Sequence, residues 1–317
     1  MNGDAAPSLR RQAWQWLSRA LGALLVLAVV LVLARQAGHI DWSAVGLALA
    51  EMPARPLLAA ASMALASHLL YGCFDLLGRR YTGHHLPTGQ VLLIGTTSYA
   101  FNLSLGAVLG GMACRARLYS RLGLPGGRIA RIVTFSLVSN WLGYLLLAGM
   151  VFALSPPELP PAWGVAELAG GGMRWLGGAL LALGLLYLVL CARHGGHALG
   201  WRQQAWPVPH LPLALAQMGL SVAHWAAMAA VLFLLLLGRV PYVQVVAVLM
   251  VAAVAGVITH VPAGLGVLEA VFVALLSHRL PAATVLASLV CYRLLFYLVP
   301  LGLGAAVFVR LEAHAAR

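Results

Sequence analysis

Long apolar runs separated by short polar gaps make up most of the chain. A helix that spans a bilayer needs about 20 mostly apolar residues. The sequence predicts eight such segments, at roughly 17–35, 56–77, 91–113, 132–154, 175–192, 211–237, 242–260 and 282–309. We therefore expect an all-α integral membrane protein in which residues 1–317 form a single transmembrane domain. A further short helix over 42–52, capped by Asp41 and Ser43, is expected to lie on the membrane surface.

The composition supports a lipid environment. Hydrophobic residues make up 62% of the 317 residues and charged residues only 9%, whereas a soluble domain carries roughly 25% charged residues. The net charge is +12, and all 20 basic residues are arginines that lie mainly in the gaps between apolar runs. Arginines placed in this way determine topology and contact anionic lipids. We expect membrane phospholipids as partners and no nucleic acid.

The distribution of arginines tests the topology. If all eight segments crossed with the N-terminus inside, nine arginines would lie on the inner side and ten on the outer side, against the positive-inside rule. If 91–113 and 242–277 instead enter and return as re-entrant segments from opposite faces, the counts become 14 and five. This second topology is preferred, and it predicts that both termini are cytoplasmic.

The two suspected breaks resemble each other at an offset of 154 residues, which matches Arg115 with Glu269. We expect two inverted repeats, at about 17–154 and 175–309, an architecture found in many secondary transporters. The breaks should meet in mid-membrane near Arg115 and Glu269. The alternative is that both segments are ordinary helices whose glycines allow close packing.

Ionisable groups within apolar segments are costly and are therefore candidates for function. Glu269 follows Gly264 and Gly266 at the start of a predicted half-helix, where it could serve a substrate or a proton. It could equally cap that helix or form a buried pair with Arg293. His260 belongs to the same break.

A second candidate group surrounds the first break. Gly110 and Gly111 would free backbone amides, and Arg115 and Arg117 follow them, a combination suited to a phosphate. Both arginines could instead serve only as orientation charges. Asn102 could hydrogen-bond across the turn, as part of the structure or to a headgroup.

Other polar residues have simpler interpretations. Asp75 lies four residues before Arg79, and this spacing favours a surface ion pair. His68 and His224 are more typical of packed histidines than of proton relays. Four cysteines without a CxxC pair, and the absence of HExxH and P-loop motifs, lead us to expect no metal, no cofactor and no enzymatic activity.

Several stretches resemble one family of bacterial membrane proteins. They are Ser67–Asp75, Tyr99–Ser104, Arg117–Pro125, Asn140–Tyr144 and His260–Ala270. The chain resembles the lysylphosphatidylglycerol synthase transmembrane family over nearly its whole length. The resemblance implies the flippase part of that family, without headgroup synthesis, in the bacterial inner membrane. The break departs from the family's Pro-Gly-Gly pattern because Ala263 precedes a single Gly264.

The leading hypothesis is a lipid translocase that moves an anionic, aminoacylated or otherwise polar phospholipid through a mid-membrane cavity. One alternative is a secondary transporter of a small solute. Another is a non-catalytic membrane partner of a lipid-synthesising enzyme. A homodimer is compatible with each of these hypotheses.

Overall fold

The computed structural model describes residues 50–161, 164, 166–201, 204–259 and 262–314, together with Ser43 and Leu47. The predicted first segment, 17–35, lies outside the described residues. So do His260 and most of the predicted surface helix 42–52.

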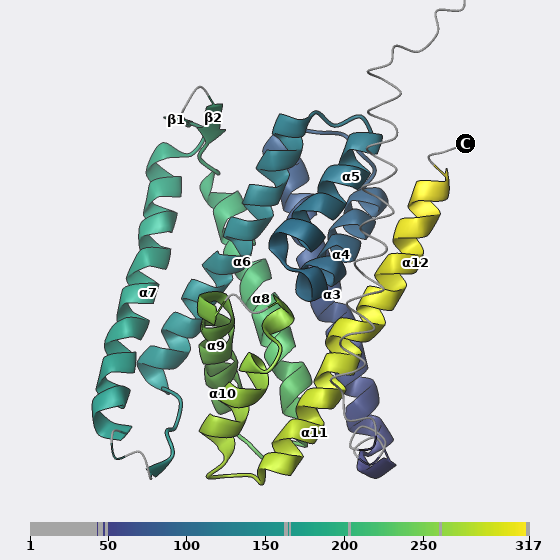
Figure 1. Ribbon diagram of the computed structural model, residues 1–317. Helices are drawn as coiled ribbons and strands as arrows, with labels where there is room; N and C mark the ends of the chain where they lie inside the picture. The colour runs from purple at the N-terminus through teal and green to yellow at the C-terminus, as the bar shows by residue number, and fades with distance from the viewer. Residues whose placement is uncertain are drawn as a thin grey trace, which may run out of the picture.

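The described residues form a helical bundle (Figure 1). In chain order its elements are α3 (Ala54–Thr82), α4 (Thr88–Leu105), η1 (Ala107–Met112), α5 (Ala113–Arg121), α6 (Gly126–Leu154), α7 (Ala166–His194), β1 (Ala198–Trp201), β2 (Gln204–Pro207), α8 (Leu211–Leu235), α9 (Tyr242–Thr259), η3 (Pro262–Gly264), α10 (Val267–Leu276), α11 (Ala282–Arg293), η4 (Leu294–Leu298) and α12 (Val299–His314).

Six stretches of the described chain are long and apolar enough to cross a membrane. They are Ala54–Thr82, Gly126–Leu154, Gly170–His194, Leu211–Leu235, Tyr242–Thr259 and Ala282–Ala313, and α10 is a shorter apolar helix. The prediction of a multi-pass helical membrane protein is therefore confirmed. One feature was not predicted: β1 and β2 pair as a short antiparallel hairpin between α7 and α8.

The predicted segment 91–113 is not one continuous helix. Helix α4 ends at Leu105, and Gly106 has φ 83° and ψ 170°, a conformation that is essentially restricted to glycine. The chain then reverses, and α5 returns to the end of the bundle where α4 began (Figure 1). The return is close, because a Cβ at Gly110 would lie 2.1 Å from the Phe101 carbonyl oxygen. Glycine is thus required at Gly106 for the turn and at Gly110 for the close approach.

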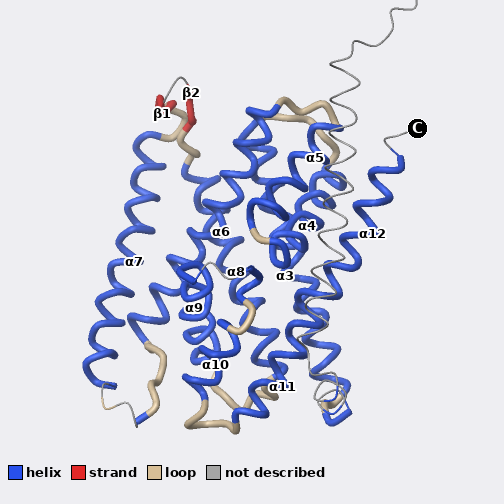
Figure 2. Tube along the Cα trace, viewed as in Figure 1, coloured by secondary structure: helices blue, strands red, loops and turns tan. Residues whose placement is uncertain are grey.

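A second hairpin is formed by α9 and α10 and opens toward the opposite end of the bundle (Figure 1). Its break contains three residues with positive φ, namely Ala263 (57°), Gly264 (58°) and Gly266 (77°). The break after α4 and the break after α9 both lie in the middle of the bundle (Figure 2).

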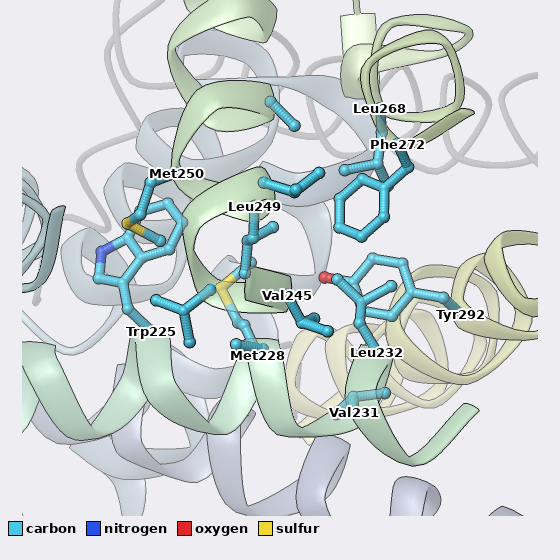
Figure 3. Packing of buried hydrophobic residues seen from close by; sticks show 14 of the residues in the cluster. Trp225, Met228, Val231, Leu232, Val245, Leu249, Met250, Leu268, Phe272 and Tyr292 are labelled. Atoms are coloured by element: carbon cyan, nitrogen blue, oxygen red, sulfur yellow. The ribbon is translucent and has the colours of Figure 1, made fainter. Parts of the chain in front are cut away.

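The long helices pack through small residues and a shared apolar core. A Cβ at Gly143 on α6 would lie 2.1 Å from the Ser221 hydroxyl of α8, so this glycine lets the two helices approach closely, as is usual within membranes. Apolar side chains of α8 belong to one core with those of the second hairpin (α9 and α10) and α11, including Leu232, Leu249, Leu268, Phe272 and Tyr292 (Figure 3). This packing holds the second break against the long helices.

Candidate functional site

A cavity of about 340 Å³ lies between the two helix breaks. The first break contributes Asn102, Leu103 and Ala107, and the second contributes Ala263, Gly264 and Leu268. Helices α3, α6, α8, α9 and α11 and the segment η4 complete the wall. Two segments about half the chain apart therefore line one chamber.

The wall of this central cavity is apolar and aromatic, with two side-chain amides. Asn102 on α4 and Asn140 on α6 both line it, and both are partly exposed. The backbone carbonyl of Asn140 accepts hydrogen bonds from Ser221 Oγ (2.9 Å) and Trp225 Nε1 (3.0 Å). These bonds tie this turn of α6 to α8 and fix the position from which the Asn140 amide projects.

The central cavity reaches the outer surface of the bundle between α6 and α9. Leu137 on α6 and Val257 on α9 line the cavity, yet they are 47% and 52% exposed. Their neighbours Val138 and Ile258 are 42% and 69% exposed. An apolar opening of this kind faces lipid rather than water in a membrane-spanning bundle.

The second break is held by a buried arginine. Arg293 Nε donates to Glu269 Oε1 (2.8 Å) and Nη2 donates to Oε2 (3.2 Å). The same guanidinium donates to the backbone carbonyls of Ala263 (2.6 Å) and Gly264 (2.8 Å). The side chain of Arg293 is only 5% exposed, and that of Glu269 is 24% exposed. Arg293 thus satisfies carbonyls that the break removes from regular helical hydrogen bonding.

The first hairpin is held by a different buried pair. Arg115 Nε donates to both oxygens of Asp75 (3.1 and 2.9 Å), and Nη2 donates to Oδ1 (2.9 Å). Tyr119 Oη (2.9 Å) and Ser136 Oγ (2.8 Å) also donate to this carboxylate, which is fully buried. The predicted surface pair of Asp75 with Arg79 is therefore wrong: Arg79 donates to Thr88 Oγ1 instead.

Arg115 and Glu269, which the sequence predicts to occupy matching positions in two repeats, are not paired with each other. Each is paired with a residue of its own half. Both arginines of these pairs also lie over a tyrosine ring: Arg115 Cζ is 5.7 Å from the centroid of Tyr71, and Arg293 Cζ is 4.7 Å from that of Tyr297. Because Tyr71 and Tyr297 line the central cavity, the guanidinium groups of Arg115 and Arg293 lie just behind the wall of that cavity.

The remaining predicted site residues lie around these features. Arg117 forms a bidentate pair with Glu312 (2.9 and 2.8 Å), which also binds Arg121 and so ties α5 to α12. Gly111 packs against Asn102, since a Cβ there would lie 2.9 Å from Asn102 Oδ1. Gly266 precedes α10 as its N-cap.

His68 on α3 and His224 on α8 are both buried. Ser67 Oγ and Tyr99 Oη lie 3.0 and 3.2 Å from the two ring nitrogens of His224. Nδ1 of His68 hydrogen-bonds the Ala64 carbonyl (2.9 Å). These contacts are those of packed histidines. Among the described residues, no group of three or more His, Cys, Asp or Glu residues could hold a metal ion.

Several residues of the site were missed in the sequence. The position of Asp75 could have indicated a buried ion pair, because an acid within an apolar segment requires a buried cation. Tyr71, which also lines the cavity, precedes Asp75 by one helical turn. Asn140 begins one of the stretches that resemble the family. Like Tyr292 and Tyr297, however, it shows nothing in its local pattern that distinguishes a cavity wall from ordinary packing.

A chain whose described part is almost entirely helical, with six candidate spans and a cavity between two broken helices, is a multi-pass membrane protein. Residues 19–304 match the family described as the lysylphosphatidylglycerol synthase TM region, and the chain belongs to this family. It is 42% identical over 303 residues to the inner membrane protein YbhN of Escherichia coli, covering 95% of this chain and 94% of the relative. It is also 30% identical over 299 residues to the uncharacterized protein slr0712 of Synechocystis, covering 92% and 91%.

Proposed function

We propose that this protein is a lipid translocase of the bacterial inner membrane, with a phospholipid headgroup passing through the central cavity. Its substrate is an anionic, aminoacylated or otherwise polar phospholipid, and it performs no headgroup synthesis. The name of the family refers to a phospholipid with a lysyl headgroup, which supports this class of substrate.

The proposal includes a topology of two inverted repeats with re-entrant hairpins. In support, α4 and α9 correspond residue for residue at an offset of 154, and their hairpins open toward opposite ends of the bundle (Figure 1). Arginines gather at the end where α4 begins, including Arg79, Arg80, Arg128 and Arg193. By the positive-inside rule this end is cytoplasmic, which would place the end of α12 in the cytoplasm; a cytoplasmic N-terminus stays a prediction, because the first segment lies outside the described residues.

The shape of the central cavity carries the proposal. Pockets of roughly 300–1,000 Å³ hold ligands the size of a drug molecule, so about 340 Å³ accommodates a headgroup but not a whole phospholipid. The exposed apolar rim at Leu137 and Val257 allows acyl chains to remain in the bilayer while the headgroup enters. A transporter of a soluble solute needs a closed polar path, and this wall offers few polar groups.

Within the cavity, the headgroup would meet the amides of Asn102 and Asn140. Arg115 and Arg293, the two arginines beside the cavity wall, are neutralised by Asp75 and Glu269. They therefore shape the cavity and its electric field but offer it no unpaired positive charge. Direct phosphate binding by Arg115 or Arg117 stays a prediction, and it requires that their carboxylate partners be released.

A cavity-filling substitution tests the proposal. Gly256 lines the cavity, and a Cβ there would meet nothing within 4 Å, so Gly256→Leu should fill the chamber without a clash. Gly219→Leu is the matched control, because Gly219 lies on the exposed face of α8 with the same free space. In liposomes that contain a fluorescent phospholipid, Gly256→Leu should abolish leaflet exchange and Gly219→Leu should preserve it.

Two results would contradict the proposal. Equal exchange rates for wild type and Gly256→Leu would show that the cavity is not the path. No exchange of any tested phospholipid by the wild-type protein, together with co-purification of a lipid-synthesising enzyme, would favour the role of a non-catalytic partner.

A further inference from the structure

A second and larger cavity, of about 770 Å³, lies at the arginine-rich end of the bundle. It is formed by the end of α3, the loop leading into α4 and the first turns of α8. It shares no lining residue with the central cavity. We call it the peripheral cavity.

The wall of the peripheral cavity is divided into an apolar part and a basic part. Cys73, Leu76, Leu77 and Leu220 form the apolar part. The basic part consists of Arg79, Arg80, His84 and His85, and no acidic residue lines the cavity. Arg80 and His85 are exposed, and Arg79 is oriented by its hydrogen bond to Thr88 (2.6 Å).

His84 lies in this wall and has one ring nitrogen without a hydrogen-bond partner. His84 is only 4% exposed, and burial together with the charges of Arg79 and Arg128 lowers the pKa of its ring. The backbone N–H of Leu86 donates to Nδ1 (3.4 Å), which leaves the ring proton on Nε2. This Nε2 is buried and has no partner in the described part of the chain.

We propose that the peripheral cavity binds an anionic phospholipid of the adjacent leaflet. Its phosphate would lie among Arg80, His84 and His85, where Nε2 of His84 gains an acceptor. The acyl chains would follow the apolar part of the wall toward α8, whose Leu215 is 52% exposed. The absence of a lining carboxylate disfavours a zwitterionic headgroup, because its ammonium group would have no counter-charge.

This inference does not depend on translocation. The binding experiment below gives the same result for a lipid awaiting transport and for a lasting structural ligand. If the central cavity allowed no leaflet exchange, the proposal of a peripheral lipid site would be unaffected. If the peripheral cavity bound no lipid, the proposed translocase function would not be refuted.

The test is native mass spectrometry of the full-length protein, titrated with phosphatidylglycerol and, separately, with phosphatidylcholine. We compare wild type with Arg80→Gln/His85→Gln. The matched control is Arg193→Gln/His194→Gln, which removes the same residue types from the exposed last turn of α7 at the same end of the bundle.

The cavity variant should bind phosphatidylglycerol about tenfold more weakly, as expected for lost basic contacts at a membrane surface. The α7 variant should match wild type, and phosphatidylcholine should bind weakly to all three. His84→Phe, which keeps an aromatic ring but removes the donor, should also weaken phosphatidylglycerol binding.

Three outcomes would overturn the inference. Equal losses in the cavity and α7 variants would indicate a general surface charge effect. Equal binding of phosphatidylcholine and phosphatidylglycerol would remove the charge selectivity. Displacement of the lipid by millimolar inorganic phosphate would assign the site to a soluble anion instead.

Discussion

The buried pair of Asp75 and Arg115 allows a sharp test of how the first hairpin is held. The substitution Arg115→Met keeps much of the side-chain volume but removes the guanidinium. Asp75 then loses all three of its contacts with arginine nitrogens and keeps only the donors Tyr119 and Ser136. Its carboxylate stays fully buried. Breaking a buried ion pair by removing one partner costs about 3–5 kcal/mol, and the two remaining hydrogen bonds favour the lower end of this range.

We therefore expect Arg115→Met to lower the free energy of unfolding by about 3 kcal/mol, roughly a hundredfold in the folding equilibrium. The double variant Asp75→Asn/Arg115→Met should recover much of this loss, because no unpaired charge then remains. Arg128→Met, at an exposed position of the same end, should change stability by less than about 0.5 kcal/mol. Unfolding in mixed micelles with increasing sodium dodecyl sulfate, followed by tryptophan fluorescence, measures all three.

The reasoning is refuted if Arg115→Met is as stable as wild type, or if the double variant is no more stable than the single one. A variant with full stability but no leaflet exchange would have a different meaning. It would show that Arg115 serves the substrate, the alternative that the sequence left open.

Three further predictions concern the second ion pair, the first break and the outer loops. Glu269→Gln should weaken the second break by about 1–3 kcal/mol, because Arg293 keeps its two carbonyl acceptors but loses its counter-charge; limited proteolysis at the break measures this. Gly106→Ala should cost about 1–3 kcal/mol from backbone strain alone, since the φ is 83° and no atom lies within 4 Å of the new Cβ; thermal unfolding measures it. Arg279 hydrogen-bonds Glu158 (2.8 Å) and lowers its pKa, so Glu158 contributes stability above its unfolded pKa that is lost as pH falls through the lower folded value. Because this carboxylate is 44% exposed, the contribution is small, and Glu158→Gln should slightly flatten the acid side of the stability profile.

Each of these predictions has a contradicting result. Unchanged proteolysis of Glu269→Gln would show that the break does not depend on the ion pair. A Gly106→Ala protein as stable as Gly89→Ala, whose backbone is helical and whose Cβ is equally free, would show that the turn is not strained. Identical acid profiles of wild type and Glu158→Gln would remove the loop pair from the stability of the protein.

The sequence by itself determined the membrane class and the positions of both breaks. Apolar runs of about 20 residues admit few alternatives to spanning helices, and the described helices follow most of the predicted segments. The breaks were visible because glycine and proline interrupt apolar helices at 106–111 and 262–266. The pair of Glu269 with Arg293 was also among the alternatives that the sequence raised, since both charges lie in apolar surroundings.

Only the tertiary structure decided which charges pair and which side chains line the cavity. Asp75 was expected to bind Arg79, four residues away, but the fold brings Arg115 to it across 40 positions of the chain. The spacing of residues in the sequence indicates which side chains are neighbours along one helix. A buried carboxylate instead pairs with the cation that the packing of other helices places beside it. For the same reason Asn140, Tyr71 and Tyr297 became recognisable as cavity residues only once α3, α6 and η4 had been placed around the two breaks.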